Sequence, residues 1–299
     1  MFQIRLDRIL TLSPFGRLSG LGRTPGIPIL MYHGVRNEIG ARHPYYETNI
    51  SPAVFEYHLQ FLRQQGYVTV GLSDVLGRMK AGQHDKVVAI TFDDGYHDFH
   101  SQAFPLLRKY GFNATLYVPS AWVGKKKIGV SPEQFMTWPE IREVSQYGVE
   151  IGSHTATHPD LYRADPQTLE DEIKLSKHAI EDNIGQPVRS FAYPFAFPEQ
   201  DRDFACRIAG LLEEVDYQNG VCTVVGRAGK GHNRFLLPRL PVNSHDDAAL
   251  LDAKLKGRYD WLHLPQYAHK AVKALLHDHR RTSFSKDYTR TQWTSQSSS

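Results

Sequence analysis

Polar residues with catalytic potential follow three separate apolar segments of the chain. They are His33, the pair Asp93 and Asp94, and the pair His154 and His158. Two imidazoles and one carboxylate, with a fourth position left open, form a common ligand set of catalytic zinc ions. The ion lowers the pKa of a water in the open position, and a second carboxylate can then act as general base. These residue types therefore predict metal-assisted hydrolysis.

The spacing within each pair adds to this prediction. His154 and His158 are four residues apart, so on a helical turn both imidazoles would lie on one side and reach one ion. Asp93 and Asp94 are adjacent at a strand end, where successive side chains point in different directions. One carboxylate could then bind the ion while the other faces the substrate. Either pattern alone is weak, because the chain has 15 histidines and Asp-Asp-Gly is also a common polar turn.

The apolar segments before these residues have the pattern of buried parallel strands. Residues 87–92, Val-Val-Ala-Ile-Thr-Phe, leave no polar face, as expected for a strand covered on both sides. Strands at 29–32, 68–70, 114–118, 149–152, 188–192, 221–225 and 236–240 alternate with helices such as 72–80, 138–147 and 166–184. The alternation predicts an α/β fold, either a barrel or a doubly wound sheet. In both, the carboxyl ends of the strands meet on one face, which would bring the polar residues together.

Composition excludes several other classes of protein. The 35 basic and 32 acidic residues of the 299-residue chain are mixed along it, so no nucleic-acid partner is expected. Cys206 and Cys222 lack the spacing of a metal site or a disulfide framework. No segment approaches the roughly 18 apolar residues of a membrane span, and no cleavable leader is visible. The sequence leaves the oligomeric state open.

The two ends of the chain differ from the middle. We expect an N-terminal extension over residues 1–26, one catalytic domain over 27–281, and a disordered Ser/Thr/Gln-rich tail over 282–299. Residues 16–28 have the composition of a linker. Before it, Leu6, Ile9 and Leu10 alternate with Arg5 and Arg8. This stretch could form an amphipathic helix on a membrane surface, a helix packed on its own domain, or a frayed tail.

At this point the sequence resembles a known family, the polysaccharide deacetylases, also called NodB-homology or carbohydrate esterase family 4 enzymes. Residues 91–96 (Thr-Phe-Asp-Asp-Gly-Tyr) and 153–159 (Ser-His-Thr-Ala-Thr-His-Pro) look like its first two motifs. Residues 29–35 and 191–195 further resemble the branch of the poly-N-acetylglucosamine deacetylases of biofilm systems. The similarity covers most of the predicted catalytic domain. It implies a distorted (β/α)7-type barrel, the NodB-homology fold.

The resemblance also implies a role for each motif residue. Asp94, His154 and His158 would bind one divalent ion, Zn²⁺ first, with Co²⁺ or Ni²⁺ as alternatives. Asp93 would be the general base that takes a proton from the metal-bound water. The oxyanion would be held by the ion and by the backbone N–H of Phe195.

Two further residues complete the expected site. The leaving amine must be protonated, and the biofilm branch draws this general acid from an N-terminal Met-Tyr-His motif, which here ends in His33. His263 is the alternative, because residues 260–263 resemble a late Leu-x-His element of the family. Tyr96 could line the substrate cleft.

One position departs from the family pattern. Many members have an arginine in the third motif that orients the catalytic aspartate, and here that position is Ala192. Arg239, after another strand, could take over the role, because a guanidinium can hold a carboxylate at two points. Arg189 is the other candidate.

The resemblance implies a hydrolase that removes N-acetyl groups from an N-acetylhexosamine-containing poly- or oligosaccharide, in exopolysaccharide or surface-polysaccharide biosynthesis. The alternatives are a silent glycan-binding relative and a metal-free glycoside hydrolase. Because no leader is seen, we expect a cytoplasmic protein or one peripherally associated with the inner membrane, acting on an N-acetylated glycan or a lipid-linked saccharide.

Overall fold

The computed structural model describes residues 5–19, 25–37, 43–127 and 133–272. Its centre is a closed barrel of parallel strands in the order β2, β12, β10, β9, β8, β5, β4, and pairing of β2 with β4 closes the ring. The strands are β2 (Ile29–Tyr32), β4 (Val87–Phe92), β5 (Thr115–Val118), β8 (Glu150–Ser153), β9 (Ser190–Ala192), β10 (Asn219–Val225) and β12 (Leu237–Pro241). The short β3 (Val68–Thr69) pairs with the start of β4. The predicted (β/α)7-type barrel is confirmed.

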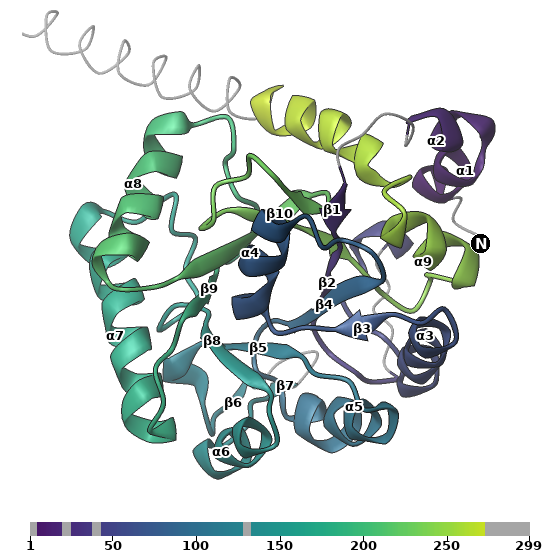
Figure 1. The fold of residues 1–299 in the computed structure, drawn as a ribbon. Coiled ribbons are helices and arrows are strands. Elements are labelled where there is room, and N and C mark those ends of the chain that lie inside the picture. Colours follow the sequence, from purple (N-terminus) through teal and green to yellow (C-terminus); the bar gives the residue numbers. More distant parts are fainter. Residues whose placement is uncertain (1–4, 20–24, 38–42, 128–132, 273–299) are drawn as a thin grey trace, which may run out of the picture.

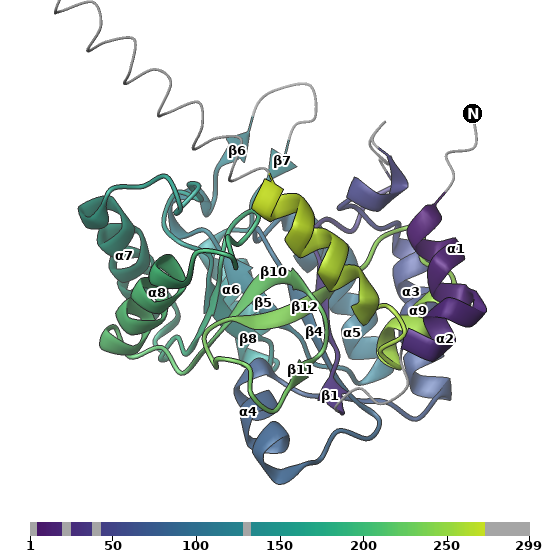
Figure 2. The same ribbon diagram turned by 90° about the horizontal axis from the view of Figure 1, so that it is seen from above.

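Helices surround the barrel and close one of its ends. Those around it are α3 (Pro52–Gln64), α5 (Phe104–Tyr110), α6 (Trp138–Gln146), α7 (Pro166–Ile184), α8 (Arg202–Glu214) and α9 (Ala248–Leu255). The helix α4 (Leu72–Ala81) lies across the end where the strands begin (Figure 1). The opposite end, where the strands finish, is the one that bears the short hairpin of β6 (Lys126–Lys127) and β7 (Glu133–Gln134) (Figure 2).

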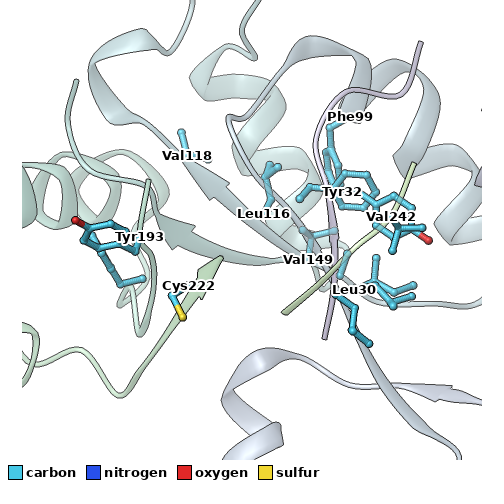
Figure 3. Close-up of a cluster of buried hydrophobic side chains, with 14 of the residues drawn as sticks. Leu30, Tyr32, Phe99, Leu116, Val118, Val149, Tyr193, Cys222 and Val242 are labelled. Atoms are coloured by element: carbon cyan, nitrogen blue, oxygen red, sulfur yellow. The ribbon is translucent and has the colours of Figure 1, made fainter. Parts of the chain in front are cut away.

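The buried strands divide their side chains between two cores. Val87 and Ala89 of β4 point into the barrel, towards the apolar face of α4. Val88, Ile90 and Phe92 point outwards into the core between barrel and helices, part of which Figure 3 shows. Because strand side chains alternate, odd-numbered positions of β4 face the interior. The same alternation directs Asp93, the next residue, into the barrel.

The N-terminal residues form two helices, α1 (Leu6–Leu12) and α2 (Pro14–Ser19), which lie near α9 (Figure 1). Asp7 and Thr11 are the buried residues of α1. The Tyr259 hydroxyl donates to Asp7 over 2.8 Å, and the Trp261 indole N–H donates to Thr11 over 3.0 Å. Arg5 donates to Asp246 over 3.0 Å. The extension is therefore fastened to the barrel domain by its polar residues.

A helix packed on its own domain is expected to bury apolar side chains and expose polar ones, and here the buried side chains are polar. Most large apolar side chains of the two helices are exposed, namely Leu6, Ile9, Leu10, Phe15 and Leu18. Of these, Phe15 also meets the ring of Trp261, with centroids 5.6 Å apart. The predicted linker over residues 16–28 is wrong in part, because α2 extends to Ser19 and β1 (Gly26–Ile27) pairs with β11 (Ala228–Gly229). Residues 20–24 and the predicted tail over 282–299 lie outside the described residues. Among the helices that are described, none is both long and apolar enough to cross a bilayer.

Candidate active site

Asp93 is held by a buried arginine inside the barrel. The guanidinium of Arg239 donates to both carboxylate oxygens of Asp93, at 2.6 and 2.7 Å, and both side chains are almost fully buried. Arg239 lies on β12 two residues after Leu237, which also faces the interior. Burial alone would raise the pKa of Asp93, but the charges of Arg239 and His154 outweigh it and hold that pKa far below its usual value.

The alternative arginine is placed elsewhere. Arg189 is exposed and directly precedes β9, so it lies at the end of the barrel where the strands begin. Ala192, at the position of the family's usual arginine, faces the barrel interior. The guanidinium contact with Asp93 is thus supplied from a different strand.

The side chains of Asp94, His154 and His158 converge next to the ion pair between Asp93 and Arg239. The Oδ1 atom of Asp94 lies 3.6 Å from Nε2 of His154 and 3.4 Å from Nε2 of His158. Ligands at roughly 2.0–2.1 Å on a tetrahedral zinc ion are separated by about 3.3 Å, so both distances from Asp94 are close to the spacing that one such ion requires. They form one of two groups of potential metal ligands among the described residues.

His154 is prepared for metal binding by its surroundings. Its Nδ1 lies 2.8 Å from the backbone oxygen of Ala192, so Nδ1 carries the proton and the lone pair of Nε2 faces Asp94. Burial lowers the pKa of His154 to about 4. The ring is therefore neutral near pH 7, and a neutral imidazole is the form that can bind a metal ion.

The segment that carries the histidines is not the helical turn expected from their spacing. Residues 154–158 form a loop, in which Thr155 and His158 have positive φ angles of 66° and 62°. The carboxylate of Glu172, on α7, accepts hydrogen bonds from the backbone N–H groups of Ala156 and Thr157 at 2.9 and 2.8 Å. Glu172 also accepts from the Thr157 hydroxyl at 2.6 Å. The histidines meet through this loop conformation, so the helical expectation was wrong while their convergence was right.

Backbone strain is concentrated at this end of the barrel. Among the described residues, six that are not glycine have a positive φ, and four of them belong to the site: Asp94, Thr155, His158 and Phe195. A left-handed conformation is unfavourable for such residues, and it is found preferentially where a side chain must be aimed for function.

The two candidate general acids are in different places. Nε2 of His33 lies 3.9 Å from Oδ2 of Asp93, and the imidazole is partly exposed. His263 instead contacts Glu199, with Nε2 at 2.7 Å from its carboxylate oxygen. Among the described contacts, His33 alone of these two touches the Asp93 carboxylate.

Phe195 contacts one of the three converging side chains, and Tyr96 follows Asp94 by two residues in the chain. The ring of Phe195 is half exposed and meets the edge of His158, with centroids 4.7 Å apart. Its backbone oxygen accepts a hydrogen bond from Thr223, which fixes the direction of the chain there. Tyr96 stacks under the guanidinium of Arg36, 4.7 Å from the ring centroid, and packs against Phe135. The ring of Phe195 therefore stands at the margin of the candidate site.

The sequence did not predict the role of Glu172, because that role depends on a tertiary contact with the loop 154–158. It lies in the middle of a predicted helix, where an acidic residue is ordinarily solvent-exposed, yet it is buried. Its position three residues after Leu169 and one before Ile173, both core residues, was the available signal that it faces inwards.

Comparison with known proteins yields consistent matches. A family model described as polysaccharide deacetylase matches residues 80–211. YxkH of Bacillus subtilis, named as a candidate polysaccharide deacetylase, is 30% identical over 73% of this chain and 71% of its own. The poly-beta-1,6-N-acetyl-D-glucosamine N-deacetylase of Escherichia coli O157:H7 is 28% identical over 51% of this chain, but only 24% of its own length.

The fold matches solved structures as well. That of the Streptococcus pyogenes deacetylase PplD in complex with acetate has a TM-score of 0.66 and 26% identity, and covers 78% of this chain and 99% of PplD. The agreement extends through almost all of that protein and supports the assignment of the barrel.

Proposed function

Since the chain belongs to the polysaccharide deacetylase family, whose members are hydrolases acting on amide bonds, we propose that it removes N-acetyl groups from an N-acetylhexosamine-containing glycan with the help of one divalent cation. A poly-N-acetylglucosamine chain or a lipid-linked precursor of a surface polysaccharide fits this activity. The name of the Escherichia coli relative, which specifies N-acetylglucosamine, supports the N-acetyl substrate.

One observation carries the proposal. Three potential ligand atoms, from Asp94, His154 and His158, lie within reach of a single ion. A second carboxylate, that of Asp93, lies beside them and is paired with Arg239 instead. A glycoside hydrolase would instead need two carboxyl groups facing each other across a sugar. Adjacent Asp93 and Asp94, one clamped and the other turned towards histidines, do not provide that arrangement.

The residues can divide the reaction between them. Asp93 stays anionic because Arg239 stabilises its charge, but a carboxylate with so low a pKa is a weak base. A divalent cation at Asp94, His154 and His158, with Zn²⁺ the best match to the donor set, would supply the acidity that the attacking water needs. His33 is placed to deliver a proton to the departing amine. The Phe195 N–H would stabilise the developing negative charge.

An acetate-release assay tests the function. We expect the purified protein to release acetate from N-acetylglucosamine oligomers, to lose this activity with EDTA, and to regain it with zinc. Polymers of O-acetylated sugars serve as the comparison substrate. Activity that persists in the metal-free protein would exclude the proposed chemistry.

A matched variant separates binding from catalysis. Asp93→Asn should abolish acetate release while the bound metal, measured by mass spectrometry, stays at the wild-type level. If Asp93→Asn turned over substrate like the wild type, Asp93 would not be the base. A protein that binds N-acetylated oligomers with intact metal but never releases acetate would be the silent relative instead.

We further propose that the two N-terminal helices rest on an anionic membrane surface. The support is the row of exposed apolar side chains on α1 and α2, together with the exposed Arg17. Arg8 is partly exposed and forms an ion pair with Asp247. Apolar side chains that enter the lipid boundary, flanked by arginines that meet anionic headgroups, are the pattern of an interfacial helix.

A further inference from the structure

A second cluster of metal-ligating side chains lies near the candidate site but is separate from it. His97 and His100 belong to the connection between β4 and α5, which begins with Asp93 and Asp94. Glu140 belongs to the first turn of α6, after the connection from β5. Both segments start at the ends of their strands, so the cluster lies at the catalytic end of the barrel. One potential ligand atom from each of the three residues lies within 4.8 Å of the others.

The distances in this cluster resemble those in the first one. Nδ1 of His97 lies 3.1 Å from Oε1 of Glu140, and Nδ1 of His100 lies 3.7 Å from the same oxygen. The His97 nitrogen is buried, yet its approach to Glu140 lacks the geometry of a hydrogen bond. Two potential ligand atoms that lie close together without a hydrogen bond between them are expected when both point at the same metal ion.

The outer contacts orient each ligand. The Oε2 atom of Glu140 accepts hydrogen bonds from the backbone N–H and the hydroxyl of Thr137, at 2.7 and 2.9 Å. The other oxygen, Oε1, is the atom that can bind a metal ion. Nε2 of His100 lies 3.0 Å from Glu143, so this nitrogen carries the proton and Nδ1 presents its lone pair. A carboxylate behind a histidine in this way is the usual outer partner of a metal-ligating imidazole.

The backbone of the cluster is unusual too. The segment Phe99–Ala103 is a π-helix, a form that is rare and occurs mainly at functional sites. It opens directly before the regular helix α5 and contains His100. The ring of His100 lies with its centroid 6.1 Å from that of His97, which stands just before this segment.

From these contacts we propose that His97, His100 and Glu140 bind a second divalent cation of the zinc type. Two imidazoles and one carboxylate suit zinc, and all three side chains are only partly exposed. The cation would join the β4–α5 connection to the start of α6, segments already linked by the hydrogen bond from the Met136 N–H to the Gly95 oxygen. It would thereby brace the turn that carries Asp94. Its role is structural and distinct from the catalytic ion.

Metal stoichiometry tests this proposal without any assay of activity. The full chain is stripped with a chelator, loaded with zinc, freed of excess metal, and measured by mass spectrometry. We expect two zinc ions per wild-type chain, one in His97→Ala/His100→Ala, one in His154→Ala/His158→Ala, and none when all four are changed. Loaded with Co²⁺, the His154→Ala/His158→Ala protein should show the visible absorption of four-coordinate cobalt.

Two controls make each outcome decisive. His178→Ala removes an exposed histidine of α7 and should keep two zinc ions. Glu143→Gln should weaken zinc binding in the His154→Ala/His158→Ala background by about 10- to 100-fold, because it alters only the outer partner. Circular dichroism establishes that the variants are folded. A folded His154→Ala/His158→Ala protein that binds no zinc or cobalt would overturn the second site, whereas zinc lost only with His97→Ala/His100→Ala would contradict the proposed catalytic site.

Discussion

At the residue scale, the buried contact between Asp93 and Arg239 is central to the proposed chemistry. Two hydrogen bonds fix the carboxylate, and the guanidinium, which also donates to the Cys222 backbone oxygen, has no exposed surface. A bidentate, charge-assisted contact restricts rotation as well as charge. Asp93 therefore presents one orientation and one protonation state to the substrate.

Replacing Arg239 should lower the free energy of unfolding. Arg239→Met leaves Asp93 as a buried charge without a partner, which costs about 3–5 kcal/mol of stability. Urea unfolding followed by circular dichroism measures the change. Combining Arg239→Met with Asp93→Asn should restore part of the loss, because no buried charge then remains.

Arg189→Met is the control for this prediction. Arg189 is exposed and remote from the strand ends, so stability and acetate release should match the wild type. Should Arg189→Met abolish activity while Arg239→Met leaves both properties unchanged, the assignment of the orienting arginine would be reversed.

The choice of general acid is also decided by single residues. His33→Gln should lower kcat for acetate release by about 10²–10⁴-fold with unchanged metal content, because proton delivery to the amine is lost. His263→Gln, which alters contacts with Glu199 and Tyr267, should leave kcat within roughly twofold of wild type. Steady-state kinetics compare the two variants, and the opposite ranking would assign the acid to His263.

At the scale of elements, the loop between β8 and α7 depends on the helix that follows it. Glu172 of α7 turns back and fixes the loop through two backbone N–H groups and the Thr157 hydroxyl. Its side-chain hydrogen bonds, among the described contacts, go to Ala156 and Thr157 and not to either histidine. It acts as a positioning residue for His154 and His158.

Removing this support should loosen the metal site. In Glu172→Ala the loop loses three hydrogen bonds, so we expect zinc to bind about 10- to 100-fold more weakly although every ligand is present. Competition with a chromophoric chelator measures the Kd. Glu170→Ala, a neighbouring change on α7 that breaks only an ion pair with Lys174, should leave the Kd unchanged. Equal affinity in the Glu172→Ala and Glu170→Ala proteins would refute the positioning role.

At the scale of the whole molecule, the N-terminal helices turn polar residues inwards and apolar residues outwards. The inward contacts are strong, because Asp246, which binds Arg5, is fully buried and also pairs with the buried Lys254. The helices are thus part of the domain surface. Their apolar face is available to an outside partner.

Vesicle sedimentation tests the proposed lipid partner. Wild-type protein should sediment with vesicles rich in phosphatidylglycerol, and less so at high salt, because arginines contribute to the attraction. Ile9→Glu/Phe15→Glu should abolish sedimentation. Leu175→Glu, at an equally exposed apolar side chain of α7, should sediment like the wild type. Wild-type protein that stays in solution, or a double variant that still sediments, would contradict membrane binding.

The sequence by itself determined most of the elements and indicated the residues of the candidate site. The unbroken apolar run 87–92 predicted a strand covered on both faces, and the structure has β4 at Val87–Phe92. The helix expected at 166–184 has those same bounds, with Asp165 capping its first N–H groups. Such features are local, because periodicity, caps and composition act over neighbouring residues.

Tertiary structure decided how residues distant in the chain meet. Arg239 reaches Asp93 because closure of the barrel brings the interior faces of β12 and β4 together, which no local pattern encodes. The His154–His158 loop takes left-handed angles that only the contact with Glu172 and the surrounding strands stabilise. The outward face of α1 likewise follows from the ion pair of Arg5 with Asp246 and the hydrogen bond from Tyr259 to Asp7, which join residues more than two hundred positions apart. Local sequence sets the conformational preferences of each element, whereas the free energy gained by closing the barrel and pairing its buried charges selects one arrangement among them.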